Sequence, residues 1–435
     1  MRSAEASLSR TLSQRLRLWG LALCTAAALV ACGGGGGGGG SSASSSSSGG
    51  SSGGSSGGSG VVSGTNVVAL VVDSGPSGIT SRIANLPYAS VTICPPGSAS
   101  GCVTIDHVLV DTGSVGLRLL ASAIGTATNF PLQTSTASST PYAACGSFVS
   151  GYTWGSVRKA DVTLGGLTTA SLPIQVIADP AYPTVPTACS NTGSSQNNVS
   201  DLGANGILGI GHFVQDCGNA CVASAVSAAY YTCASASSCT PAAIPLAQQI
   251  ANPVAKMPSD NNGSMIVFPT VNSGGQTTVA GSLVMGIGTR TNNAVGSAVA
   301  YGVDRSTGYL SSAYNGRTYS RTAFDSGSNF YFFSDSTLAR CSGSSSSFYC
   351  PTSTQTLSAT ISGTNAVSGT VSFRIANAST LFTTPSSTAV LPDVGATLGS
   401  TTGFLFGLPF YYGRSVFTAI IDASTPLGTG PFVAF

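Results

Sequence analysis

One short pattern occurs twice in this chain, once in each half, and it limits the possible folds more than any other feature. A β-prone stretch runs into Asp-Thr-Gly-Ser at residues 108–114 and into Asp-Ser-Gly-Ser at residues 322–328. Each copy is followed, later in its own half, by two apolar residues and a glycine, at residues 207–209 and 405–407. Because the parts recur in the same order, the sequence predicts two duplicated lobes.

From residue 61 onward the chain has the rhythm of an all-β protein. Short runs rich in Val, Ile, Thr, Phe and Tyr are interrupted by clusters of Gly, Pro, Asn or Ser, with a spacing of about eight to twelve residues. The best candidate for a helix is residues 245–254. The clearest predicted strands are residues 67–72, 103–110, 160–164, 174–177, 265–268, 330–333 and 415–421.

Charged residues are scarce, and their scarcity excludes several classes of function. Only 7% of residues are charged and the formal net charge is +2, so no basic field is available to bind nucleic acid. The two histidines, His107 and His212, are too few for a three-histidine metal centre. Glu5 is the only glutamate, which leaves aspartates for any carboxylate chemistry. We therefore expect no nucleic-acid partner, no metal and no cofactor.

The first sixty residues are typical of an export signal followed by a tether. A basic start precedes an apolar run at residues 16–31, which is too short to span a bilayer and indicates a signal peptide at residues 1–31. The run ends in Leu-Val-Ala-Cys, which resembles a bacterial lipobox with lipidation at Cys32; the alternative is a plain signal peptide with an incidental cysteine. Residues 33–60 contain only Gly, Ser and one Ala, so residues 32–60 are predicted to be the lipidated cysteine and a flexible linker.

The position of the anchor indicates where the protein resides. Gly33 follows the lipobox cysteine, and the lipobox resemblance then implies an exported outer-membrane lipoprotein, on the periplasmic face or at the cell surface. Contact with the membrane would pass through the lipid on Cys32. Beyond the linker we predict an N-terminal β lobe with a Cys-rich insertion at residues 61–255 and a C-terminal β lobe at residues 256–435, in a monomeric protein.

Ten cysteines follow Cys32, and in an exported protein an even number favours disulfide bonds. Two pairs, Cys94 with Cys102 and Cys341 with Cys350, are close enough in sequence to close local loops. Zinc binding by the middle cysteines is the weaker alternative, because their spacing differs from that of a zinc ribbon and an oxidising compartment disfavours thiolates. The pairing of the middle six is left open: Cys145, Cys189, Cys217, Cys221, Cys233 and Cys239.

On these motifs the chain resembles the pepsin-like aspartic proteases over most of residues 65–435. In that family each lobe supplies one Asp-Thr/Ser-Gly loop, and an apolar-apolar-Gly strand passes behind it. Residues 206–211 are similar to that strand in the N-terminal lobe, and residues 404–410 and 416–422 to the closing strands of the C-terminal lobe. The resemblance implies a retropepsin/pepsin-type acid protease fold, which is all-β and bilobal with closed or sandwich-like β lobes.

The resemblance assigns the catalytic roles to Asp111 and Asp325. Two facing carboxylates cannot both ionise, so they share one proton; one then accepts a proton from a bound water while the other polarises the scissile carbonyl. Gly113 and Gly327 would let backbone amides reach the inner carboxylate oxygens. The remaining support residues are Thr112 and Ser326, whose hydroxyls would bridge the loops, and Ser114 and Ser328, which would bond the outer oxygens.

Residues 151–166 are similar to the flap hairpin of the same family and the strand after it. Counting back from the two glycines that end this segment, the tyrosine at the tip of the family's flap falls on Phe148, with Tyr152 or Trp154 as substitutes. These three side chains are therefore the candidates for contact with a substrate.

Together these features predict a lipid-anchored aspartic endopeptidase that hydrolyses an extended peptide or protein substrate laid across a cleft between lobes. The alternative is a non-catalytic pepsin-fold protein for binding or surface recognition, which is favoured by the altered flap and by Gly116 and Arg118 in place of the family's asparagine and tryptophan. A third interpretation, a β-sandwich adhesin, predicts that Asp111 and Asp325 lie far apart.

Overall fold

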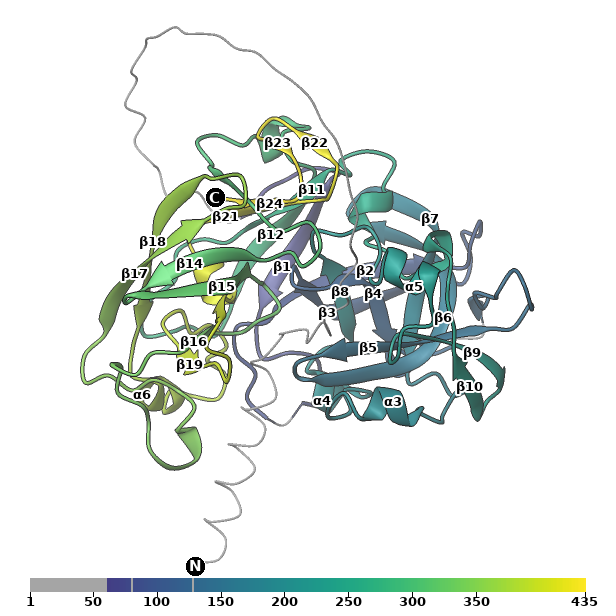
Figure 1. Cartoon of the computed structure of the whole chain (residues 1–435), viewed down its shortest axis with the longest axis horizontal. Coiled ribbons are helices and arrows are strands. Elements are labelled where there is room, and N and C mark those ends of the chain that lie inside the picture. Colours follow the sequence, from purple (N-terminus) through teal and green to yellow (C-terminus); the bar gives the residue numbers. More distant parts are fainter. Residues whose placement is uncertain (1–60, 80, 127–128) are drawn as a thin grey trace, which may run out of the picture.

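The computed structural model describes residues 61–79, 81–126 and 129–435 (Figure 1). The predicted signal peptide, the lipidation site at Cys32 and the Gly/Ser linker lie outside the described residues. Within the described part, no helix has the length and apolar character that a membrane crossing requires.

The described part of the chain is all-β, as predicted, and its largest sheet has fifteen strands drawn from both halves of the sequence. The strands of this sheet are β1 (Val67–Val72), β2 (Pro87–Cys94), β3 (Val103–Asp111), β4 (Val115–Leu120), β5 (Tyr142–Phe148), β6 (Gly151–Leu164), β7 (Leu167–Ile177), β8 (Gly206–Ile210), β9 (Tyr230–Ser235), β10 (Ser238–Pro241), β11 (Gly263–Val267), β12 (Val279–Met285), β13 (Ala300–Gly302), β21 (Ser415–Ala419) and β24 (Phe432–Ala434). Their order in space is β10-β9-β5-β6-β7-β4-β8-β3-β2-β1-β12-β11-β21-β24-β13.

A second sheet of seven strands belongs wholly to the C-terminal half and has the order β18-β17-β14-β15-β20-β16-β19. Its strands are β14 (Leu310–Tyr314), β15 (Arg317–Phe324), β16 (Tyr331–Phe333), β17 (Gln355–Ser362), β18 (Ser368–Ile375), β19 (Gly395–Thr397) and β20 (Gly403–Phe406). A small hairpin joins β22 (Ser424–Thr425) to β23 (Gly428–Thr429). In Figure 1 the seven-stranded sheet lies on the left, and β4 to β10 lie on the right.

The repeated sequence pattern corresponds to the same arrangement of three strands in each half. In the first half β8 pairs parallel with β3 and antiparallel with β4. In the second half β20 pairs parallel with β15 and antiparallel with β16. The apolar-apolar-Gly strand therefore lies between the strand that enters each Asp-Gly loop and the strand that leaves it, so the two loops are held in equivalent ways.

The predicted strands are all present, but two of them are only parts of longer strands. Residues 67–72 form β1 with both ends as predicted. Residues 160–164 and 174–177 are the last residues of β6 and β7, which begin at Gly151 and Leu167. The part of β6 before the predicted strand contains Arg158, a buried charge whose Nη2 atom lies 2.8 Å from Asp179 Oδ2.

Helices in the described residues are short: α2 (Ala121–Ile124), α3 (Thr187–Ser190), α4 (Val199–Leu202), α5 (Asn219–Ala223) and α6 (Ala378–Phe382). The predicted helix at residues 245–254 is wrong, because that segment holds only one 3-10 turn, Leu246–Gln248, and the start of another, Val254–Lys256. Between them Gln249 is extended, and the backbone N–H of Ile250 donates to the Tyr230 hydroxyl at 2.8 Å. Tertiary partners thus take the amides that a helix would need.

The ten cysteines of the described residues form five disulfides, which confirms that prediction and settles the pairing that the sequence left open. The bonds join Cys94 to Cys102, Cys145 to Cys189, Cys217 to Cys221, Cys233 to Cys239 and Cys341 to Cys350. Four of them close short loops. Only Cys145–Cys189 joins residues far apart in sequence, with a separation of 44, and it ties β5 to α3.

Candidate functional site

The two Asp-Gly loops lie against each other, and each supplies hydrogen-bond partners to the other. Thr112 N donates to Ser326 Oγ at 3.1 Å, and Ser326 N donates to Thr112 Oγ1 at 3.0 Å. The same hydroxyls donate onward, Thr112 Oγ1 to Phe324 O at 3.2 Å and Ser326 Oγ to Val110 O at 2.8 Å. Both side chains are buried. The hydroxyls therefore bridge the loops in the way that the sequence predicted.

Each loop holds its own carboxylate with a matching pair of donors. Gly113 N donates to Asp111 Oδ1 at 2.8 Å, and Gly327 N donates to Asp325 Oδ1 at 2.9 Å. The outer oxygens accept from hydroxyls: Asp111 Oδ2 from Ser114 Oγ, and Asp325 Oδ2 from Ser328 Oγ at 2.7 Å. Because both oxygens of each side chain are engaged, the carboxyl groups have fixed orientations.

Asp111 and Asp325 face each other across the seam between the loops. A Cβ atom placed on Gly113 would lie 2.7 Å from Asp325 Cγ, and one placed on Gly327 would lie 2.5 Å from Asp111 Oδ1. Only glycine allows such close approach of a backbone to a carboxylate at these two positions. The adhesin interpretation, which required the two aspartates to be far apart, is therefore wrong. We refer to Asp111 and Asp325 as the dyad.

The dyad is nearly inaccessible to solvent, with 6% of Asp111 and 2% of Asp325 exposed. Burial, together with the charge of Asp325 and a hydrogen bond to it, raises the pKa of Asp111 from 3.8 to about 8. The hydrogen bonds from Ser114 and Gly113 act in the opposite direction but are outweighed. The pair consequently retains one proton at a pH where ordinary aspartates are ionised.

Comparison with known proteins places the chain in a family. Residues 62–435 match the family described as "Protein of unknown function (DUF3443)". The chain belongs to the DUF3443 family. No curated protein matches the sequence. The part shared with DUF3443 includes both Asp-Gly loops, all five disulfides and every strand described above.

The retained proton gives a prediction about the stability of this DUF3443 protein. In the unfolded chain Asp111 ionises near its ordinary pKa of 3.8, whereas in the folded protein it holds its proton to about pH 8. The folded state thus binds more protons between these values, and its stability falls as the pH rises through them. Asp111→Asn removes this penalty, so its free energy of unfolding relative to wild type should increase from pH 4 to pH 8, by up to about 5 kcal/mol.

Urea denaturation at the two pH values measures this difference. Asp422→Asn is the matched control, because it removes an aspartate whose side chain is 72% exposed. For Asp111→Asn, the free energy of unfolding relative to wild type should increase between the two pH values. For the control it should not change. A gain of the same size in both variants would show that the net charge of the protein, and not the dyad, produces the effect.

The structure corrects the position of the predicted hairpin. Residues 151–164 form one continuous strand, β6, and the hairpin consists of β5 and β6 joined at residues 149–150. Sequence reasoning missed β5 because its small residues, which include Ala143, Ala144 and Gly146, do not read as a strand. They pair in register with β6, where Cys145 lies opposite Trp154.

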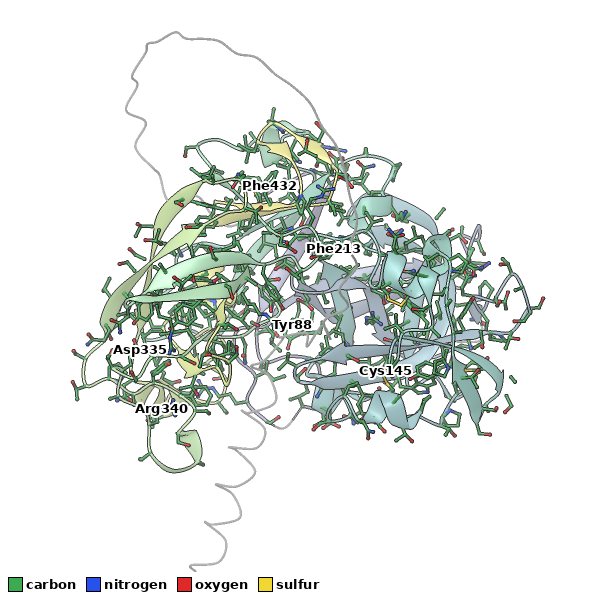
Figure 2. All side chains as sticks on the ribbon, viewed as in Figure 1. Tyr88, Cys145, Phe213, Asp335, Arg340 and Phe432 are labelled. Atoms are coloured by element: carbon green, nitrogen blue, oxygen red, sulfur yellow. A yellow bond between two sulfur atoms is a disulfide. The ribbon has the colours of Figure 1, made fainter. Side chains whose placement is uncertain are left out.

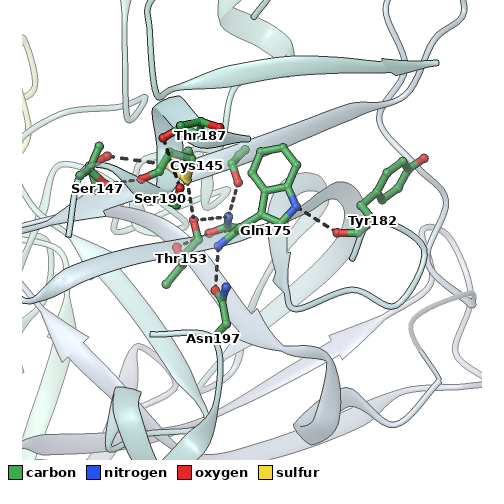
Figure 3. Close-up of a disulfide and its surroundings, with 12 residues drawn as sticks. Cys145, Ser147, Thr153, Gln175, Tyr182, Thr187, Ser190 and Asn197 are labelled. Atoms are coloured by element: carbon green, nitrogen blue, oxygen red, sulfur yellow. Dashed lines mark hydrogen bonds between the residues drawn. A yellow bond between two sulfur atoms is a disulfide. The ribbon is translucent and has the colours of Figure 1, made fainter. Parts of the chain in front are cut away.

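The three predicted substrate-contacting residues lie on different faces of this hairpin. Trp154 is 1% exposed, and its indole N–H donates to Tyr182 O at 2.9 Å, a bond that can be followed in Figure 3. Tyr152 belongs to the same buried cluster around Cys145. Both therefore have little surface to offer a substrate. Phe148, the last residue of β5, is half-buried on the opposite face and lies next to Arg118.

Two residues that support the loops had no signal in the sequence. The hydroxyl of Tyr411 lies 3.1 Å from Thr112 Oγ1, and Tyr411 is fully buried. Asn85, also fully buried, donates to Asn329 O at 2.9 Å, directly after the second loop, and to Leu391 O at 2.7 Å. Both contacts join residues more than 240 positions apart, so no local pattern could have indicated them.

Pockets in the described surface also occur away from the loops. One of about 410 Å³ is lined by residues that include Arg317, Asp335 and Arg340, and another of about 420 Å³ by residues that include Asp304 and Arg321. Figure 2 places Asp335 and Arg340 at the seven-stranded sheet, on the opposite side of the molecule from Cys145. Neither pocket is lined by the dyad, so we assign neither to the candidate site.

Proposed function

We propose that this DUF3443 protein is an aspartic-type endopeptidase in which Asp111 and Asp325 activate a water molecule for attack on a peptide bond. The observation that carries the proposal is the pair of facing, buried carboxyl groups, each held by a glycine amide and a serine hydroxyl. An aspartate that only stabilises a turn does not need a second, equivalent loop beside it, with hydrogen bonds from each loop to a hydroxyl of the other.

The chemistry of the proposal follows from the shared proton. The ionised carboxyl group accepts a proton from the water, whose oxygen then attacks the carbonyl carbon, while the protonated group donates a hydrogen bond to the carbonyl oxygen. The raised pKa of Asp111 favours this singly protonated state. Gly113 and Gly327 fix the inner oxygens, so the carboxyl groups need no reorientation during the reaction.

The finer description of the fold is also a proposal. A bilobal, pepsin-like architecture is supported by the two equivalent three-strand arrangements, β3-β8-β4 and β15-β20-β16, each of which presents one Asp-Gly loop. Five disulfides support export to an oxidising compartment. With the lipobox-like sequence at Cys32, they are compatible with an outer-membrane lipoprotein that acts on peptides or proteins outside the cytoplasm.

A second candidate function is recognition of a partner without cleavage. It is favoured by the burial of Trp154 and Tyr152 in the core of the hairpin, where a substrate-binding aromatic side chain was expected. The low exposure of the dyad favours it too.

A cleavage assay separates the two candidates. The full-length protein, incubated at acidic pH with a denatured protein as substrate, should release fragments, and pepstatin should stop the cleavage. Binding of pepstatin or of denatured substrate with no fragments at any pH from acidic to neutral would instead favour recognition without catalysis. Cleavage that continues at full rate in the presence of saturating pepstatin would contradict the aspartic mechanism.

A further inference from the structure

Arg118 is a buried charge for which the proposed reaction has no use. It lies on β4, the strand that begins directly after Ser114, and is 5% exposed. Its Nη2 atom lies 2.7 Å from Asp216 Oδ2, and its Nη1 atom donates to Gln175 Oε1 at 2.9 Å. The strand that leaves the first Asp-Gly loop therefore carries a fixed cation close to the dyad in sequence.

Through Gln175 this cation is connected to both strands of the β5–β6 hairpin. Gln175 Nε2 donates to Ala144 O of β5 at 2.7 Å, and Thr153 Oγ1 of β6 donates to Gln175 Oε1 at 2.9 Å. Figure 3 shows Gln175 and Thr153 side by side in this arrangement. Gln175 thus acts as a bridge from the guanidinium group to the hairpin.

The guanidinium group also lies near the end of the hairpin. Its central carbon lies 6.0 Å from the centre of the Phe148 ring, within the range of a cation–π contact. A Cβ atom on Gly146 would lie 3.1 Å from Arg118 Nη1, so the bare glycine leaves room for the charged group beneath β5. Phe148, the last residue of β5, is therefore a neighbour of Arg118.

Asp216, the partner of Arg118, directly precedes Cys217. It belongs to residues 211–241, which follow β8 and contain two disulfides, and which we call the cystine-rich segment. Its Oδ1 atom accepts from the Tyr230 hydroxyl at 2.5 Å, and that hydroxyl accepts from Ile250 N at 2.8 Å. Tyr230 belongs to β9, which pairs with β5 opposite Ala144. The segment therefore supplies both the charge that neutralises Arg118 and a strand that borders the hairpin.

We propose that Arg118, held by Asp216, is a positioning residue that fixes the β5–β6 hairpin relative to β4, the strand that leaves the first Asp-Gly loop. In this position Arg118 sets how tightly the peptide substrate binds. This inference rests on the proposed function. It assigns a purpose to the cystine-rich segment, which would hold the anchor of the hairpin instead of contacting the substrate itself. Loss of the Asp216 charge leaves Arg118 buried without its partner, so the guanidinium group must move and the hairpin end moves with it.

The test compares two ion pairs that each contain a buried carboxylate, one next to the hairpin and one away from it. Asp216→Asn breaks the pair with Arg118, and Asp260→Asn breaks the pair of Arg290 with Asp260, whose side chain is 3% exposed. For Asp216→Asn we expect KM to rise roughly tenfold or more with kcat changed less than about twofold. We expect Asp260→Asn to lower stability but leave the KM of the folded enzyme unchanged, because neither Asp260 nor Arg290 belongs to the β5–β6 hairpin.

Hydrogen exchange gives a readout that does not depend on activity. In Asp216→Asn the backbone amides of residues 144–153 should exchange faster, while in Asp260→Asn the faster exchange should be confined to residues near Asp260 and Arg290. Tyr230→Phe is the second variant, because it removes the hydrogen bond to Asp216, together with the acceptor of Ile250 N, and leaves both charges in place. It should show the same pattern at smaller amplitude.

Three outcomes decide the matter. Faster exchange of residues 144–153 in Asp216→Asn but not in Asp260→Asn supports the positioning role. Unchanged exchange of these residues in both Asp216→Asn and Tyr230→Phe, or equal acceleration in Asp260→Asn, overturns it. Wild-type protein that cleaves no substrate would overturn the proposed peptidase instead, and the exchange measurement would still report whether Arg118 holds the hairpin.

Discussion

Asp111→Asn and Asp325→Asn should each lower the rate of peptide cleavage by at least about 10³-fold, because the substitution removes a group that must gain or lose a proton in the reaction. Asparagine has nearly the same shape and keeps an oxygen to accept the hydrogen bond from Gly113 or Gly327. The loops should therefore stay in place. Since the two carboxyl groups act as one unit, the double variant should be no worse than either single variant.

Initial rates of cleavage of a fluorogenic peptide measure this loss, and circular dichroism confirms that the variants are folded. Asp422→Asn, which removes an exposed carboxylate far along the chain from both loops, should retain the wild-type rate. Full activity in either dyad variant would show that cleavage takes place elsewhere or comes from a contaminating protease.

Loss of the Cys145–Cys189 disulfide should be the most costly single change for stability that we predict. This bond joins residues separated by 44 positions, and loop-closure entropy gives about 4 kcal/mol for a loop of that length. Both sulfur-bearing side chains are also buried in the cluster around Trp154. The double substitution Cys145→Ala with Cys189→Ala should lower the free energy of unfolding by about that amount.

The matched control is Cys233→Ala with Cys239→Ala, which opens a disulfide spanning only 6 positions in the β9–β10 hairpin. The same entropy argument gives about 2 kcal/mol for this shorter loop. Equilibrium denaturation of both variants tests the difference. Equal costs for the two pairs would mean that packing of the sulfur atoms, not closure of the long loop, provides the stabilisation.

The sequence was sufficient to locate the dyad loops because the information is local and is repeated. A β-prone stretch followed by Asp-Thr/Ser-Gly-Ser occurs twice, and the strand that separates the two sides of each loop is marked by its own glycine, Gly209 or Gly407. The backbone positions that require glycine, Gly113 and Gly327, are part of the same motif. Short β-strands with branched residues, such as β1, were found for the same reason.

The contacts around the hairpin were not predictable, since they join residues that are far apart in sequence. Arg118 and Asp216 are 98 positions apart, and nothing near either residue marks it as one half of a buried pair. Arginines and aspartates are rarely buried, so the sequence offers no reason to place these two in the interior as a pair. The same applies to Arg158 and Asp179, a buried pair whose arginine lies in the part of β6 that precedes the predicted strand.

The backbone amides of Thr112 and Ser326 each donate to the side-chain hydroxyl of the other residue, so neither Asp-Gly loop is complete on its own. Cutting the chain between its halves and separating the fragments would leave each of these two amides without its acceptor, because that acceptor lies on the other fragment. Neither fragment would then contain the full set of hydrogen bonds that holds its Asp-Gly loop. The geometry of each loop is therefore a property of the two halves together, and a fragment of either half would not preserve it.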